Sequence, residues 1–268
     1  MIMTNARYKL MIPETSLYDV KRGTRFPAEI SENLAELVGI YLGDGHLAKT
    51  VYKDEYKFQI TGHALQDKFY YEKFVIPLIK EIFNVQPCLR FKKTEKVVEL
   101  DTFSKGVFLF LTRNFGLPIG KKTDITIPSA FFDNTDLLRG CLRGIIDTDF
   151  YLSLYKDSVS LGALFGQESL VRSLETAFSI LDIPCKVSLN HAQKDKRTNK
   201  TYIGHRISVR NRGIDAAFGK IGTHHPMMAL KYRMWKNGEF AASKDITSDP
   251  RLLETTASAF KFGNVYNL

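Results

Sequence analysis

Two ten-residue stretches decide the fold: "ELVGIYLGDG" at residues 36–45 and "CLRGIIDTDF" at residues 141–150. Each is an apolar segment that has a glycine inside a predicted helix and an aspartate near its end. At a spacing of 105 residues the two align, relating Gly39 to Gly144 and Asp44 to Asp149. Self-similarity at a fixed spacing predicts a duplicated structural unit.

Small residues recur every four positions on one face of each predicted helix. The predicted helix interface consists of Ala35, Gly39, Gly43, Gly140 and Gly144, and Thr148 continues the pattern. A glycine inside a helix costs about 0.5–1 kcal/mol relative to alanine, so a compensating contact is expected. Because small residues let two helix backbones approach closely, we predict that these helices pack together and bring Asp44 close to Asp149.

Two adjacent carboxylates would repel each other and any phosphate, and a divalent cation resolves this conflict. Mg²⁺ prefers oxygen ligands and can bridge carboxylates and phosphate oxygens, and Mn²⁺ or Ca²⁺ could take its place. Aspartate before glycine is also ordinary turn chemistry, as at Asp44. Recurrence of the acid at Asp149, in the same register, favours the metal site.

The segments between the two stretches alternate between strand and helix patterns. Apolar and polar residues alternate at 56–61, 89–92 and 206–212, which predicts strands with one apolar and one polar or basic face. Amphipathic helices are predicted at 66–83, 104–116 and 167–181. We therefore expect an α+β fold of two pseudo-symmetric αββαββα halves, at 31–133 and 134–240, with extensions at 1–30 and 241–268.

The charge distribution favours a polyanionic partner. Lys and Arg exceed Asp and Glu by 38 − 29 = 9, and residues 186–212 hold eight basic residues and one acid. Polar and basic strand faces would present these side chains to a polyanion such as a nucleic acid. The residues expected to bind it are Lys57, Gln59, Arg90, Lys92, Arg206, Ser208, Arg210 and Arg212.

Several other classes of protein and site are disfavoured. No apolar run is long enough to span a bilayer, and the N-terminus lacks a signal-peptide core. We therefore expect an intracellular protein, cytoplasmic or organellar, that is neither secreted nor membrane-bound. The three cysteines suit neither a disulfide framework nor a zinc site. His224 and His225 lack a second ligand cluster, which favours loop or capping roles.

The segments "LVGIYLGDG" at 37–45 and "LRGIIDTDF" at 142–150 resemble the two motifs of the single-chain LAGLIDADG homing endonucleases. The resemblance covers about residues 30–235. It implies that the motif helices form the interface between the halves and that two saddle-shaped antiparallel sheets lie over the DNA major groove. It also implies that Asp44 and Asp149 bind the metal, with the backbone carbonyls of Gly43 and Thr148 as further ligands.

The resemblance further implies basic side chains near the scissile phosphates, for which Lys122 and Lys231 are the candidates. Phe150 stands where the family has glycine, and Asp147 occupies a position where an outer-sphere or structural role is expected. The function implied is that of a monomeric, Mg²⁺-dependent homing endonuclease that cuts a long asymmetric DNA target. The alternative is a non-catalytic relative, either an intron RNA maturase, with RNA as partner, or a DNA-binding regulator.

Overall fold

The computed structural model describes residues 9–92, 96–155, 158–194 and 199–238. The C-terminal extension predicted at 241–268 lies outside these residues. The helices are α1 (Leu17–Lys21), α2 (Glu32–Asp44), α3 (Lys68–Tyr70), α4 (Ile76–Phe83), α5 (Lys105–Phe115), α6 (Thr135–Asp149), α7 (Glu168–Ile180), α8 (Arg212–Lys220) and α9 (Pro226–Lys236). The strands are β1 (Gly45–Thr50), β2 (Glu55–His63), β3 (Cys88–Lys92), β4 (Val97–Phe103), β5 (Tyr151–Tyr155), β6 (Ser158–Phe165), β7 (Cys185–Lys194) and β8 (Thr201–Arg210).

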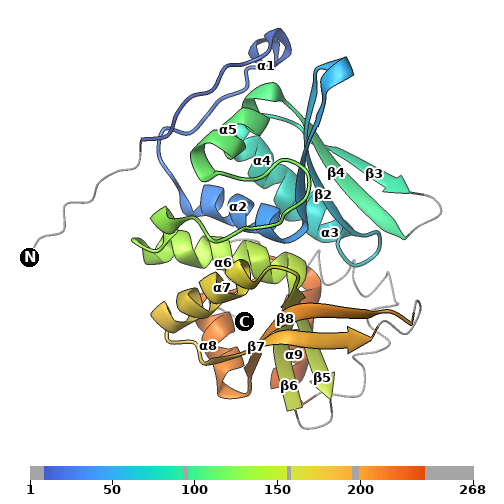
Figure 1. Ribbon diagram of the computed structural model, residues 1–268, viewed down its shortest axis with the longest axis vertical. Helices are drawn as coiled ribbons and strands as arrows, with labels where there is room; N and C mark the ends of the chain where they lie inside the picture. The colour runs from blue at the N-terminus through green and yellow to red at the C-terminus, as the bar shows by residue number, and fades with distance from the viewer. Residues whose placement is uncertain (1–8, 93–95, 156–157, 195–198, 239–268) are drawn as a thin grey trace, which may run out of the picture.

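The strands form two four-stranded antiparallel sheets with the same topology. Their orders are β1-β2-β4-β3 and β5-β6-β8-β7. Helices α2 and α6 cross the middle of the molecule, with one sheet on either side of them (Figure 1). The predicted α+β architecture is confirmed. No helix within the described ranges combines the length and apolar character needed to cross a membrane.

The two central helices begin at capping residues and are buried along most of their length. The Ser31 side chain accepts a hydrogen bond from the backbone of Leu34, and the Asn134 side chain caps α6 in the same way. Every residue of α2 from Leu34 to Gly43 is buried. This burial follows from its position, because α2 packs on its own sheet and also on α6.

The strand patterns mostly have the predicted orientation. Phe58 and Ile60 of β2, like Ile207 and Val209 of β8, are buried. The strand predicted at 89–92 is present, although Phe91 on its apolar side is 49% exposed. Phe91 belongs to β3, the edge strand of its sheet.

The strand predicted at 206–212 was two residues too long, because β8 ends at Arg210. Asn211 has a φ of 50°, in the left-handed region that ends regular strand geometry, and Arg212 opens α8. The helix predicted at 66–83 starts at Lys68 and contains a π-helical turn at Tyr71–Val75. Pro77 lies in the first turn of α4, where its missing N–H is tolerated.

A buried carboxylate fastens the N-terminal segment to the first half. Asp19 in α1 accepts hydrogen bonds from the Ser104 hydroxyl at 2.7 Å and from the Gly106 amide at 3.0 Å. It also accepts bonds from the amide and the hydroxyl of Ser16. These bonds join α1 to the start of α5.

Each half is hydrogen-bonded to a segment from the last part of the other half. The side chain of Gln167, at the N-cap of α7, donates to the Lys122 carbonyl at 2.6 Å. Asp67, at the N-cap of α3, bonds the ring of His225 at 3.0 Å. The crossed tails, residues 117–128 and 221–225, therefore tie the halves together independently of the helix pair.

Candidate functional site

The two central helices are in backbone contact at their glycines. A β-carbon on Gly39 would lie 2.0 Å from the carbonyl oxygen of Cys141, and one on Gly144 would lie 2.2 Å from that of Glu36. A β-carbon on Gly140 would lie 2.5 Å from the carbonyl oxygen of Glu32. No side chain larger than hydrogen fits at these positions without a shift of one helix.

The carboxylates at the helix ends meet at one end of this contact. Asp44 and Asp149 are the last residues of α2 and α6. A β-carbon on Gly43 would lie 2.9 Å from a carboxylate oxygen of Asp149 and 2.0 Å from the Thr148 hydroxyl. That hydroxyl donates to the Gly144 carbonyl at 2.8 Å, which keeps it on its own helix.

Burial weakens the acidity of both groups, and repulsion by Asp149 weakens that of Asp44 further. Burial raises the pKa of Asp44 well above its usual value, and the charges of Asp149 and Asp67 raise it further, whereas Lys122 opposes the shift. Burial raises the pKa of Asp149 to about 6, again against the effect of Lys122. The pair therefore carries unfavourable negative charge that a cation would relieve.

Lys122 lies at the centre of this charge cluster. Its ammonium group donates to the carbonyls of Tyr41 at 3.2 Å and Leu42 at 3.0 Å, and also to that of Gly43. Burial lowers the pKa of Lys122, while the charges of Asp149 and Asp44 raise it. The ammonium group thus faces two half-buried carboxylates and the C-terminal end of α2.

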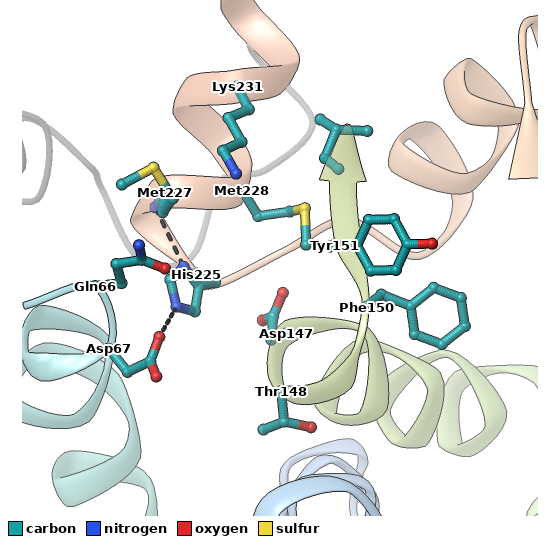
Figure 2. A pocket seen from close by; sticks show the side chains of 11 residues that line it. Gln66, Asp67, Asp147, Thr148, Phe150, Tyr151, His225, Met227, Met228 and Lys231 are labelled. Carbon is teal, nitrogen blue, oxygen red and sulfur yellow. Dashed lines mark hydrogen bonds and ion pairs between the residues drawn. The ribbon is translucent and has the colours of Figure 1, made fainter. Parts of the chain in front are cut away.

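Lys231 has a different setting from Lys122. It projects from α9 into a pocket of about 190 Å³ that is also lined by Asp67, Thr148 and His225 (Figure 2). Burial lowers its pKa. Lys122 comes from a loop and Lys231 from a helix, so the two candidate lysines do not occupy equivalent places.

The end of the helix pair fits a divalent cation by its donor chemistry. Asp44 and Asp149 supply carboxylate oxygens, which are the ligands that Mg²⁺, Mn²⁺ and Ca²⁺ prefer. The carbonyl of Gly43 adjoins them, although here it accepts a hydrogen bond from Lys122. The raised pKa values of both acids mark a site whose charge needs a positive partner.

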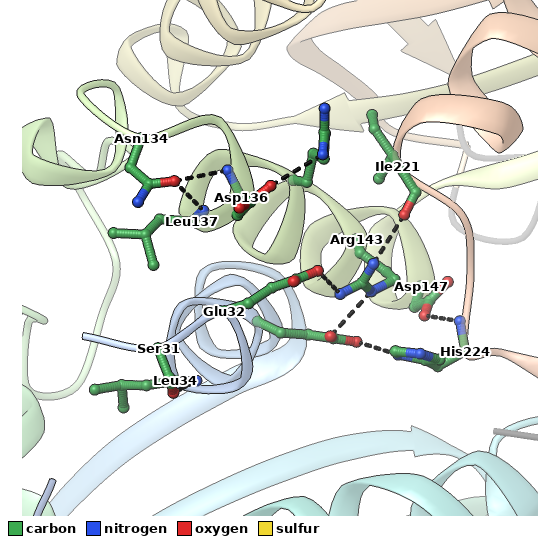
Figure 3. Close-up of polar contacts among 12 residues, drawn as sticks. Ser31, Glu32, Leu34, Asn134, Asp136, Leu137, Arg143, Asp147, Ile221 and His224 are labelled. Atoms are coloured by element: carbon green, nitrogen blue, oxygen red, sulfur yellow. Dashed lines mark hydrogen bonds and ion pairs between the residues drawn. The ribbon is translucent and has the colours of Figure 1, made fainter. Parts of the chain in front are cut away.

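A second acidic cluster lies nearby and is internally satisfied (Figure 3). Glu36, Asp147 and His224 could in principle hold a metal together. However, Arg143 donates to Glu36 at 2.9 Å and to Glu32 at 2.5 Å, and the His224 ring bonds Glu36 at 2.7 Å. A buried guanidinium already neutralises this cluster, so we interpret it as an ionic lock between the halves.

Asp147 belongs to this lock and does not lie in the helix contact. It accepts hydrogen bonds from the Thr223 hydroxyl and from the His224 amide, the latter at 2.8 Å. His225 caps α9, because its side chain accepts the Met227 amide. The cluster around His224 could not be found from the sequence, since its members come from three distant segments.

Phe150 follows Asp149 without disturbing the end of the helix. It is buried and packs edge-on against Phe165 and Phe178, with ring centroids 6.1 Å away in each case. The aromatic ring therefore fills the core of the second half. The turn after Asp149 leads into β5 as the turn after Asp44 leads into β1.

The polar face of the first sheet contains acids that pair with the predicted DNA-binding residues. Asp101 accepts from Gln59 at 2.7 Å, forms an ion pair with Lys57 at 3.7 Å and pairs with Arg90. Glu99 pairs with Lys92 at 2.9 Å and with Arg90 at 3.3 Å. Both acids lie on β4, where their alternation with Val98 and Leu100 was a signal that sequence reasoning missed.

The second sheet has a different charge. Its strands, β5 to β8, contain no Asp or Glu among the residues that the structure describes. Arg206 donates to the Tyr151 hydroxyl at 3.3 Å, Ser208 is buried, and Arg210 is exposed at the end of β8. Arg212 is exposed at the start of α8 rather than on the strand.

Comparison with known proteins identifies the fold. No protein-family model and no curated protein matches the sequence. Among solved structures, I-DmoI in complex with DNA and Ca is similar, with a TM-score of 0.52 and 18% identity over 75% of this chain and 97% of that one. The homing endonuclease I-WcaI bound to its DNA recognition sequence has a TM-score of 0.50 and 15% identity over 76% of this chain and 86% of that one.

A third similar structure, the N-terminal LAGLIDADG domain of DUF199/WhiA, has a TM-score of 0.47 and 12% identity over 80% of this chain and 96% of that one. This chain has the fold of the LAGLIDADG homing endonucleases.

Proposed function

We propose that this protein is a monomeric, divalent-cation-dependent homing endonuclease that cuts both strands of a long asymmetric DNA target. The observation that carries the proposal is the meeting of Asp44 and Asp149 at the ends of helices from different halves. The similarity of the fold to DNA-bound endonucleases supports it.

The residues of the chain have separate roles in this proposal. Asp44 and Asp149 would hold the cation, with the carbonyls of Gly43 and Thr148 as further ligands. When bound, Mg²⁺ or a similar cation supplies a nucleophilic hydroxide and stabilises the leaving oxygen. Lys122 would place its positive charge beside one scissile phosphate.

The remaining candidates serve the second phosphate and the DNA contact. Lys231, from the pocket beside Thr148, is proposed for the other scissile phosphate. The strand residues of both sheets would contact phosphates and base edges in the major groove. Because Asp101 and Glu99 neutralise the polar face of the first sheet while the second sheet stays basic, the two half-sites of the target are expected to differ.

Cleavage of a randomised plasmid library in Mg²⁺, followed by sequencing of the new ends, tests the proposal. The wild-type protein should cut defined sites. Asp44→Asn and Asp149→Asn should each abolish cutting and preserve binding, because each removes one cation-binding charge. Asp182→Asn, at a 90% exposed carboxylate, is the matched control. Sequence-specific binding of DNA or RNA without cutting would overturn the proposal and favour a maturase or a regulator.

A further inference from the structure

A third carboxylate, that of Asp67, faces the same end of α2 as Asp44. After burial and the charge of Asp149, the charge of Asp67 is the next largest influence that raises the pKa of Asp44. Burial and the charges of Asp44 and Asp67 together raise the pKa of Tyr71. Asp67 also lines the pocket beside Thr148, and its side chain is 23% exposed. It is therefore accessible and close to the end of the helix pair.

The orientation of Asp67 is fixed by two hydrogen bonds, one of them from the other half. The His63 amide donates to one carboxylate oxygen at 2.5 Å, and Nε2 of His225 bonds the other at 3.0 Å. The Met227 amide donates to Nδ1 of His225 at 3.2 Å. The proton of a neutral His225 is therefore on Nε2, where it donates to Asp67 (Figure 2). Each oxygen of Asp67 keeps the capacity to accept another hydrogen bond.

A second polar group near Asp67 lacks a partner. The Tyr71 hydroxyl is buried and makes no hydrogen bond with any of the residues that the structure describes. A β-carbon on Gly62 would lie 2.4 Å both from this hydroxyl and from a carboxylate oxygen of Asp67. The two polar groups therefore fill the place of a side chain on Gly62. A buried hydroxyl without a partner costs free energy, which indicates a ligand at this position.

In the second half the residue that corresponds to Asp67 is Gln167, the N-cap of α7, whose uncharged amide donates to the Lys122 carbonyl. The strand registers make Phe165 the equivalent of Gly62. Phe165 packs against Phe150, so an aromatic contact stands where the first half has Gly62. The two sides of the proposed catalytic centre thus differ, with a carboxylate at the N-cap in the first half and a neutral amide at the N-cap in the second.

We propose that Asp67 is a positioning residue that strengthens divalent-cation binding beside Asp44 and makes the two DNA strands unequal in cleavage rate. The inference rests on the proposed nuclease function. Its basis is the added negative charge of Asp67 and the capacity of its oxygens to accept further hydrogen bonds. His225, which belongs to the other half, holds the Asp67 carboxylate in place. The corresponding N-cap residue of the second half, Gln167, carries no charge.

Calorimetry of Mn²⁺ binding to the DNA-free full-length protein tests whether Asp67 strengthens cation binding. Asp67→Asn should weaken Mn²⁺ binding about 10–100-fold, as is typical when a group that orients a metal site is lost. Asp182→Asn should bind as wild type. His225→Asn keeps a residue able to cap α9 but is too short to reach Asp67, so it should give a smaller loss in the same direction. Thermal unfolding without cation verifies that each variant is folded.

Cleavage of a duplex labelled separately on each strand tests whether Asp67 makes the two strands unequal in cleavage rate. In Mg²⁺, Asp67→Asn should slow one strand at least 10-fold more than the other, so that nicked duplex accumulates. If Asp67→Asn binds Mn²⁺ like wild type, or slows both strands equally, the inference is overturned while wild-type cleavage still supports the nuclease. If wild-type protein neither binds Mn²⁺ nor cuts DNA, the proposed function itself fails.

Discussion

Gly39 lies directly against the carbonyl oxygen of Cys141, so close that a β-carbon would be 2.0 Å from it. Gly39→Ala should therefore force the two central helices apart and destabilise the protein by about 1–3 kcal/mol. Chemical denaturation measures the change. The control is Gly219→Ala in α8, where a β-carbon meets nothing within 4 Å. That change should stabilise by about 0.5–1 kcal/mol through helix propensity. Equal effects of the two substitutions would contradict the backbone contact.

Asp149 should make the cation-free protein less stable as pH rises. Burial raises its pKa from 3.8 to about 6, although Lys122 opposes the shift. Between these values the folded state binds a proton that the unfolded state lacks, so the stabilisation is full below the lower pKa and is lost as pH rises through the higher one. In denaturation with chelator from pH 4 to 7, wild type should lose about 1–3 kcal/mol more than Asp149→Asn, which keeps the contributions of Asp44 and Asp147.

Cation binding should have the opposite pH dependence. The cation needs the ionised form of Asp149, so Mn²⁺ affinity should increase as pH rises through about 6. Calorimetric titrations at pH 5.5 and 7.5 measure this difference. An affinity that does not change over this range would argue against Asp149 as a ligand.

Asp101 should limit non-specific DNA binding by the first sheet. It neutralises Arg90 and Lys57 and holds the amide of Gln59 in one orientation. Asp101→Asn should free the positive side chains of Arg90 and Lys57 from this partner. We therefore expect tighter binding to random DNA and weaker discrimination between target and random DNA. Competition binding at several salt concentrations measures both, because additional Arg and Lys contacts to phosphates make DNA affinity depend more steeply on salt. Asp136→Asn, at an exposed acid on α6, is the control. An unchanged specificity ratio would count against this role.

Asp19 should stabilise the protein only when it is ionised. Burial acts to raise its pKa, but hydrogen bonds from Ser104, Gly106 and Ser16 outweigh it and lower the pKa below 3.8. The stabilisation is therefore present above that value and lost as pH falls through the folded-state pKa. Asp19→Asn should cost about 1–3 kcal/mol at pH 7 and less at pH 3. Denaturation at both pH values measures this, and a constant difference would exclude the linkage.

The sequence allowed the helix pair and most strand faces to be predicted, because both depend on local periodicity. The four-residue spacing of Gly39 and Gly43 is visible in one stretch, and the repeat shows its partner at Gly144. The alternation around Phe58 likewise defines which side of β2 is buried. It could not show that Phe91 extends from an edge strand beyond the core.

The polar contacts that shape the site were beyond the reach of local patterns. Glu36 and Arg143 are 107 residues apart, and Asp67 and His225 are 158 apart. Nothing in either neighbourhood specifies such a pairing. Lys122 and Lys231 were candidates by family resemblance, and the sequence could not show that one lies in a loop and the other in a helix.

The crossed tails bear on how this molecule could be re-engineered. A hybrid that joined one half to an unrelated half would lose both the bond between Gln167 and the Lys122 carbonyl and the bond between Asp67 and His225. The interchangeable module is thus one sheet with its loops. The helix pair and the crossed tails would be kept unchanged. Swapping sheets in this way would leave the proposed cation site assembled.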